Sequence, residues 1–292
     1  MEVRNNIFGF NTFKPVNSGI KKVFNNGISN DIFVRSTNSS NPSFKGNIRE
    51  LLDKDYETLS KDEKNILRKE IDNYQKEVID DCIKASTVLK AVYDDRYGEN
   101  NWEYISIGRS CSMIAKCLAM MGVKTHIIPI SGLQFGIEDG RELTKEEGFE
   151  KYRDFIYKSG LSPEEVESSG KTYIFQDYCD SGKSLRLFEQ FIRSDEMGLN
   201  KDNITFESIN EGLYDNIQKL QELGIENFNP FSFLSMRLGA QNLYGSLKTH
   251  TSTPKLHYKD IDKIDEVVKE PVRTIYKIFE FGMEDKIRNN MN

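Results

Sequence analysis

The sequence has no long apolar run, few cysteines and no excess of basic residues. Its longest apolar stretches fall far short of a membrane span, and residues 1–11 lack the apolar core of a signal peptide. The formal net charge of −6 argues against a general binder of nucleic acid or of membrane surfaces. We therefore expect a cytoplasmic protein that binds neither.

Cysteine and histidine are too sparse for a framework of disulfides or metal ligands. The cysteines contain no CxxC pair, so a disulfide framework and a zinc site are not expected. His126 lies in an apolar stretch typical of a core histidine, whereas His250 and His257 flank a Thr-Ser-Thr-Pro segment typical of a surface loop. The cysteines, which we interpret as reduced thiols, are Cys82, Cys111, Cys117 and Cys179.

The composition that remains is that of an ordinary globular protein. Over 292 residues, 37% are hydrophobic and 29% charged, enough for one large α/β domain or two smaller ones. Many Asn, Ser and Gly residues and weak periodicity predict an irregular N-terminal arm over 1–59, with short strands near 7–13 and 32–34. We expect an α/β core over 60–225 and a C-terminal helical extension over 226–292.

Strand and helix patterns alternate within the predicted core. A capping box formed by Ser60 and Glu63 opens a long helical pattern that ends near Tyr97. The alternation that follows predicts a doubly wound α/β fold with a mainly parallel sheet, whose ligands bind at the carboxyl ends of the strands. The predicted strands are 104–107, 125–130, 172–175 and 203–208, and the predicted helices after the first strand are 112–121, 185–192, 211–223, 231–246 and 260–289.

A helical insertion over 132–170 is predicted between the second and third strands. Thr144 with Glu147, and Ser162 with Glu165, have the spacing of two helix starts. The segment is longer than a usual loop, so either a lid over the sheet edge or a passive decoration fits it.

The most informative segment runs from Thr172 to Ser184, a strand followed by a small-residue turn and a helix. The turn Asp180-Ser181-Gly182-Lys183-Ser184 offers backbone N–H groups, two hydroxyls and the positive end of a helix to one point. That point suits a phosphate group. Asp177 would repel a phosphate, so we expect it to serve sugar hydroxyls or a metal ion, and the whole indicates a phosphosugar ligand.

This segment resembles the signature of the type I phosphoribosyltransferases. In that family an apolar strand leads into two acids and then into a loop that holds the 5′-phosphate of phosphoribosyl pyrophosphate (PRPP). Asp180, Ser181, Gly182, Lys183 and Ser184 match that loop, and Asp177 matches the second acid. Gln176 stands where the first acid is usual. The resemblance therefore implies that Gln176 and Asp177 contact the ribose hydroxyls.

A second turn supports the resemblance. Gly108-Arg109-Ser110 follows the first core strand, where the family places its pyrophosphate-binding turn, and Arg109 can pair with phosphate oxygens. The resemblance covers about residues 100–210. It implies transfer of the phosphoribosyl group to a nitrogen acceptor such as a nucleobase, with Asp177 and Arg109 as catalytic residues. Mg²⁺ would be bound mainly through PRPP, and a homodimer is compatible with the sequence.

The family covers its site with a loop after the second core strand. The insertion occupies that place, and its candidate phosphate donors are Arg141, Lys145 and Arg153.

Two other functions fit the same residues. Gly182-Lys183-Ser184 would end a P-loop, but Asp177 stands at the position of its first glycine, where a carboxylate would repel the nucleotide. A non-catalytic module that senses PRPP or a nucleotide keeps the fold without the reaction, and Gln176 in place of an acid favours it. Pyrophosphate release from PRPP distinguishes the enzyme from both.

Overall fold

We describe a computed structural model of the chain. The chain divides into two units, Met1–Phe44 and Lys45–Asn292, and every residue with a described structure belongs to the second. The described residues are 46–73, 76–108, 111–178, 182–209, 256–269 and 274–290.

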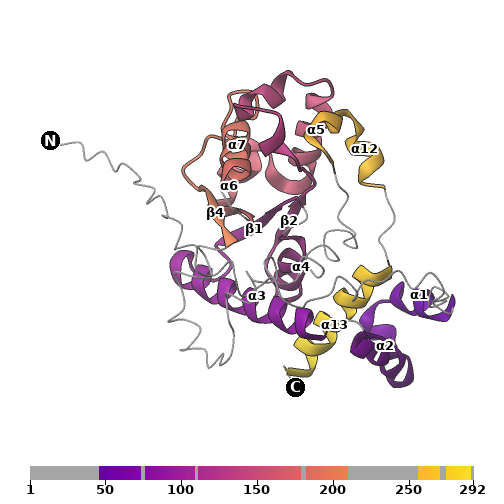
Figure 1. Ribbon diagram of the computed structural model, residues 1–292. Coiled ribbons are helices and arrows are strands. Elements are labelled where there is room, and N and C mark those ends of the chain that lie inside the picture. The colour runs from indigo at the N-terminus through magenta and orange to yellow at the C-terminus, as the bar shows by residue number, and fades with distance from the viewer. Residues whose placement is uncertain are drawn as a thin grey trace, which may run out of the picture. The chain divides into compact units, whose positions relative to one another are not determined.

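A parallel four-stranded sheet forms the centre of this unit (Figure 1). The strand order is β2-β1-β3-β4, and all three neighbouring pairs are parallel. In register, Ile105 of β1 lies beside His126 of β2 and Phe175 of β3. The strands are β1 (Trp102–Ile107), β2 (Thr125–Ile128), β3 (Thr172–Asp177) and β4 (Ile204–Ser208).

Helices cover both faces of the sheet because the strand residues alternate between two apolar clusters. Tyr104 and Ile174 belong to one cluster, and their neighbours Ile105 and Phe175 belong to the other. The predicted α/β class with a parallel sheet is confirmed. Helices on both faces are also what a doubly wound arrangement requires.

The first cluster joins the sheet to helices from both ends of the described chain. Ile278 and Phe281 of the last helix pack in the same cluster as Leu67 and Leu89. The last helix, predicted as part of a C-terminal extension, is therefore integrated with the core. The helices of this cluster are α1 (Gly46–Leu52), α2 (Lys61–Asn73), α3 (Lys76–Tyr97), α4 (Ser112–Met120) and α13 (Thr274–Asn290), with the 3₁₀ turn η3 (Tyr56–Thr58) beside them.

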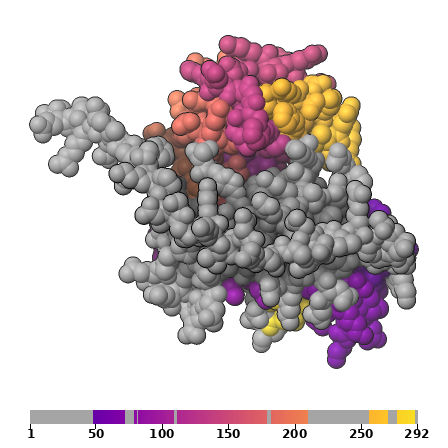
Figure 2. Space-filling model, viewed as in Figure 1, coloured from indigo at the N-terminus to yellow at the C-terminus, as the bar shows by residue number. Residues whose placement is uncertain are grey.

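The second cluster contains the predicted insertion, which forms a structural layer and not a separate decoration. Tyr152 and Val166 of the insertion are buried with Phe188 and Phe191 of α7. The segment 256–269, yellow in Figure 2, packs against the insertion. The elements of this cluster are η4 (Leu133–Phe135), η5 (Gly140–Lys145), α5 (Phe149–Ile156), the π-helical turn η6 (Tyr157–Leu161), α6 (Pro163–Ser169), α7 (Lys183–Ile192), η7 (Tyr258–Lys263) and α12 (Ile264–Val267).

Two of the predicted helix starts are confirmed. The Ser60 N–H donates to Glu63 at 2.8 Å while the Glu63 N–H donates to the Ser60 hydroxyl at 3.3 Å, which is a reciprocal capping box. Ser162 and Glu165 form the same box at the start of α6.

Other predictions differ from the structure. The helix start at Thr144 with Glu147 is wrong, because the Thr144 hydroxyl donates to the Arg141 carbonyl and α5 begins only at Phe149. The single long helix predicted after Ser60 is divided between α2 and α3, with residues 74–75 outside the described ranges. The arm predicted to be irregular through residue 59 contains α1 and η3.

Several predicted elements lie outside the described residues. They are the strands near 7–13 and 32–34 and the helices at 211–223 and 231–246.

A buried carboxylate lies near the amino edge of the sheet. Glu103 of β1 is 2% exposed, accepts a hydrogen bond from His126 Nε2 at 2.8 Å, and pairs with Lys124 and Lys171 at 3.2 and 3.3 Å. Burial alone would raise the pKa of Glu103, but the hydrogen bonds from His126 and the two lysines outweigh it and lower the pKa to about 2. His126 is thus a satisfied core histidine, as its sequence context predicted.

Candidate functional site

The strand order makes the carboxyl ends of β1 and β3 the place where a ligand crevice is expected. The helix that follows β1, α4, packs in the first apolar cluster, whereas α7, which follows β3, packs in the second. Chain segments that leave two neighbouring parallel strands toward opposite faces form a topological switch point, where ligands of open α/β sheets bind. The two turns predicted to bind phosphate groups follow these two strands.

The turn after β3 leads directly into α7. Asp177 is the last residue of β3, it is partly exposed, and its Oδ1 accepts a hydrogen bond from the Tyr178 N–H at 2.7 Å. Gly182 has φ +66° and immediately precedes α7, which begins at Lys183. The first N–H groups of α7 have no partners within the helix and carry its positive dipole end, so they can receive an anion. Asp180 and Ser181 lie outside the described residues.

The segment after β2 reaches the same place. The Ser184 hydroxyl, in the first turn of α7, donates to the side-chain carbonyl of Gln134 in η4. At the other side, the Gly108 N–H at the end of β1 donates to the Ile128 carbonyl of β2 at 2.7 Å. Residues that follow β1, β2 and β3 therefore meet at one edge of the sheet. Arg109 and Ser110 continue the turn after Gly108 but lie outside the described residues.

Gln176, near the carboxyl end of β3, lies inside the fold and not on its surface. It is fully buried, the Tyr104 hydroxyl donates to its Oε1 at 2.8 Å, and its Nε2 donates to the Tyr93 hydroxyl at 2.9 Å. Tyr93 in turn donates to Glu207 of β4, which also pairs with Arg96 at 2.8 Å. Burial and the Glu207 carboxylate raise the pKa of Tyr93 well above its usual value, so the phenol keeps its proton. Both ends of the Gln176 amide are thus engaged by tyrosines.

Two candidate phosphate donors of the insertion, Arg141 and Lys145, lie away from the predicted phosphate turn. Arg141 pairs with Asp139 at 2.5 Å, and Arg153 lies over the Phe149 ring at 5.4 Å. Arg141 and Lys145 line a polar hollow of about 520 Å³ together with residues 193–196, which follow the end of α7. The predicted phosphate turn precedes the start of α7, so these two cations face the opposite end of that ten-residue helix, a distance of roughly 15 Å.

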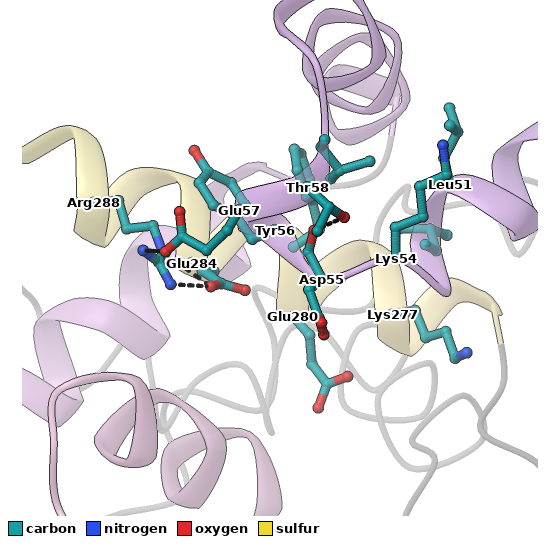
Figure 3. A pocket seen from close by; sticks show the side chains of 13 residues that line it. Leu51, Lys54, Asp55, Tyr56, Glu57, Thr58, Lys277, Glu280, Glu284 and Arg288 are labelled. Carbon is teal, nitrogen blue, oxygen red and sulfur yellow. Dashed lines mark hydrogen bonds and ion pairs between the residues drawn. The ribbon is translucent and has the colours of Figure 1, made fainter.

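A second hollow lies between α1, η3 and α13, away from the sheet edge (Figure 3). It has a volume of about 480 Å³ and a charged rim in which Arg288 pairs with Glu57 and Glu284. Its apolar floor includes Leu51 and Phe281, both members of the first apolar cluster. Other charged side chains of its lining, Lys54, Lys277 and Glu280, form ion pairs with residues outside the hollow, so we assign no ligand to it.

No protein-family model, curated protein or solved structure matches this chain. Within the described ranges no helix has both the length and the apolar character to cross a membrane, and no three His, Cys, Asp or Glu side chains gather as a metal site would require.

Nothing in the sequence indicates that three residues lie near one another after β2 or at the start of α7. Gln134 contacts Ser184, its neighbour Phe135 is 80% exposed, and His257 forms a parallel bridge with Ser131 after β2. His257, which the sequence placed in a surface loop, is partly exposed, and its backbone bridges to Ser131 in the segment after β2. Only the long-range pairing of residues 131 and 257 could have revealed the place of His257.

Proposed function

We propose that the chain binds PRPP in the crevice between β1 and β3 and transfers its phosphoribosyl group to a nitrogen acceptor, releasing pyrophosphate. The observation that carries the proposal is the strand order. It makes the β1–β3 pair the switch point of the sheet, and both turns that resemble phosphoribosyltransferase motifs follow these two strands.

The 5′-phosphate is assigned to the turn from Asp180 to Ser184. Backbone N–H groups at the start of α7 are its main donors, and the helix dipole favours its charge. Because the Ser184 hydroxyl is directed at Gln134, we assign Ser184 the task of anchoring the turn through its side chain. Ser181 and Lys183 complete the phosphate contacts in this proposal.

The ribose is assigned to Asp177. Its carboxylate stands at the end of β3, immediately before the phosphate turn, where sugar hydroxyls attached to a bound 5′-phosphate would come within reach. Gln176, the other predicted ribose contact, is engaged by Tyr93 and Tyr104, so the proposal gives the ribose one carboxylate instead of two.

The pyrophosphate is assigned to Gly108, Arg109 and Ser110 after β1. Arg109 would stabilise the negative charge that develops on the leaving pyrophosphate. The donor set of this edge suits a magnesium ion held mostly by its ligand and water, since Asp177 is the carboxylate that the described part of the crevice offers. When bound, Mg²⁺ would neutralise part of the pyrophosphate charge.

In the proposed reaction the protein mainly positions the bound PRPP and stabilises the leaving pyrophosphate. The acceptor nitrogen forms a bond to the anomeric carbon, the bond from that carbon to pyrophosphate oxygen breaks, and the electron pair leaves with pyrophosphate. The proton that the acceptor nitrogen loses passes to solvent. Holding the phosphate at α7 and the ribose at Asp177 fixes the anomeric carbon for this attack.

The direct test is release of pyrophosphate from PRPP, with Mg²⁺ present, across a panel of purine and pyrimidine bases. The proposal predicts turnover with at least one base and none without PRPP. A protein that PRPP stabilises against heat without turnover would be the sensing module that the engaged Gln176 favours. Stabilisation by ATP but not by PRPP would contradict the proposal and favour the P-loop.

A substitution at Gly182 offers a second test. A control glycine that has nearly the same φ but lies elsewhere in the fold distinguishes the effect of backbone strain from the effect of position. A Gly182→Ala substitution places a side chain at φ +66° and costs about 1–2 kcal/mol of stability. Because it also distorts the phosphate turn, we expect the Kd for PRPP, measured by calorimetry, to rise roughly tenfold.

The matched control is Gly170→Ala. Gly170 has φ +64° and, like Gly182, no atom within 4 Å of an added Cβ, but it precedes β3 at the amino edge of the sheet. We expect a similar loss of stability with PRPP affinity unchanged. An equal loss of PRPP affinity in both variants would show that Gly182→Ala weakens binding through a general loss of stability and not through the phosphate turn.

A further inference from the structure

A row of polar side chains crosses the sheet near the carboxyl ends of three strands. Ser106 of β1, Gln176 of β3 and Glu207 of β4 lie beside one another in register. Gln176 is fully buried, although its neighbours in β3, Ile174 and Phe175, are apolar. An apolar side chain of the same size would avoid the cost of burying an amide, so the amide indicates a need for its hydrogen bonds.

The amide matches its two partners in a way that a carboxylate cannot. The Tyr93 hydroxyl donates its proton to Glu207 at 2.9 Å, so its oxygen is left to accept the hydrogen bond that Gln176 Nε2 donates at 2.9 Å. Gln176 Oε1 accepts from the Tyr104 hydroxyl at 2.8 Å. The position therefore needs one donor and one acceptor, whereas an ionised glutamate offers acceptors alone. Gln176 is thus specific to this network and is not a weakened form of an acid that contacts ribose.

The network connects the end of β3 with the turn after β1. Tyr104 also forms a side-chain hydrogen bond with Cys111, which is buried. Cys111 immediately follows the turn 108–110 and is the N-cap residue of α4. On the other side, Gln176 immediately precedes Asp177, the last residue of β3. A continuous series of side-chain contacts, from Cys111 through Tyr104 to Gln176, therefore links the segments assigned to pyrophosphate and to ribose.

Gln176 also lies where the backbone support from β1 ends. In register, Gln176 is the last residue of β3 that pairs with β1, through Ser106. Asp177 has a register partner in β4, Ser208, but none in β1 among the described strand pairs. The hydrogen bond from Tyr104 of β1 to Gln176 thus holds β3 against β1 at the point where the ladder stops. Loss of that bond would let Asp177 shift relative to the turn after β1.

We propose that Gln176 is a positioning residue, which fixes Asp177 relative to the turn after β1 through Tyr104 and does not itself contact a ligand. The proposal rests on the proposed function, because it takes Asp177 to bind the ribose and the turn 108–110 to bind pyrophosphate. Two contacts with one PRPP molecule must be correctly spaced, so a shift of Asp177 weakens binding although every group that contacts the ligand remains.

A double-mutant cycle tests whether Gln176 acts through Asp177. In calorimetric titrations of the full chain with Mg²⁺ present, Gln176→Met, which keeps the size of the side chain and removes the amide, should raise the Kd for PRPP about tenfold. In an Asp177→Asn background the same substitution should raise that Kd by less than about twofold, because the contact that Gln176 positions is already weakened. Affinity for inorganic phosphate, which binds at the start of α7, should be unchanged in Gln176→Met.

A second variant keeps the proposal testable if Gln176→Met does not fold. Tyr104→Phe removes one hydroxyl from the same network and should raise the Kd for PRPP about threefold. The matched control is Tyr56→Phe, which removes a hydrogen bond of 2.7 Å to Asp285. Tyr56 packs against the same apolar cluster as Tyr104, but its bond joins η3 to α13. The control should lower stability as Tyr104→Phe does and leave PRPP affinity unchanged.

The outcomes separate this proposal from the proposed function. Unchanged PRPP affinity in Gln176→Met and Tyr104→Phe overturns the positioning role and leaves the PRPP site in place. An equal effect of Gln176→Met with and without Asp177→Asn has the same consequence. Equal loss of PRPP affinity in Tyr56→Phe and Tyr104→Phe would assign the effect to general stability and also overturn the positioning role. Failure of the unsubstituted chain to bind PRPP overturns both proposals.

Discussion

Replacing Glu103 with alanine is expected to lower the free energy of unfolding by about 3 kcal/mol. The carboxylate is almost completely buried and accepts hydrogen bonds from His126, Lys124 and Lys171. His126 belongs to β2, whereas Lys124 and Lys171 immediately precede β2 and β3. Its removal leaves a buried imidazole without an acceptor and two lysines without a counter-charge. Chemical denaturation of the variant and the unsubstituted protein measures the difference directly.

The same residue predicts a pH dependence. The pKa of Glu103 is about 2 in the folded chain against an ordinary value of 4.5, so the unfolded chain binds the proton first as pH falls. The stabilisation from Glu103 is therefore complete above about pH 4.5 and is lost progressively between about pH 4.5 and 2. In Glu103→Ala the decline of stability over that range should be shallower.

An exposed ion pair supplies the control. Glu167 pairs with Lys201 at 3.0 Å, but its side chain is 72% exposed, and such pairs contribute little. Glu167→Ala should change the free energy of unfolding by less than about 0.5 kcal/mol and should keep the full pH dependence. A loss in Glu103→Ala no larger than in Glu167→Ala would contradict the account of the cluster.

Features fixed by a few neighbouring residues could be predicted from the sequence. The capping boxes at Ser60 and Ser162 each depend on two residues three positions apart, and both form as predicted. Strand β3 and helix α7 could be predicted from two local apolar patterns separated by a glycine turn. The alternation of such strand and helix patterns predicted the parallel sheet.

Features fixed by distant residues could not be predicted in this way. Whether Gln176 contacts a ligand or the core depends on Tyr93, which lies 83 residues earlier in the chain. The place of His257 depends on a backbone bridge to Ser131, in a distant part of the sequence. Thr144 has the spacing of a capping box, but its hydroxyl bonds backward to Arg141 because the preceding residues form a 3₁₀ turn.

Asp177→Asn is expected to weaken PRPP binding by roughly 10- to 100-fold, because a charged acceptor for the ribose hydroxyls becomes neutral. The substitution is nearly isosteric, and the amide oxygen of asparagine can still accept the hydrogen bond from the Tyr178 N–H that Asp177 accepts at 2.7 Å. The fold should therefore be retained. Affinity for inorganic phosphate should not fall, since removal of the carboxylate relieves repulsion of the anion.

Asp202→Asn is the matched control. Asp202 is exposed and lies just before β4, at the amino edge of the sheet, so the same change of charge occurs away from the crevice. Its affinities for PRPP and for inorganic phosphate should equal those of the unsubstituted chain.

The measurement that tests the central claim most directly is a calorimetric titration of PRPP, with Mg²⁺ present, into the unsubstituted chain, Asp177→Asn and Asp202→Asn. A PRPP site between β1 and β3 predicts saturable binding to the unsubstituted chain and to Asp202→Asn, and markedly weaker binding to Asp177→Asn. No heat of binding in the unsubstituted chain, or equal PRPP affinity in all three proteins, would contradict it.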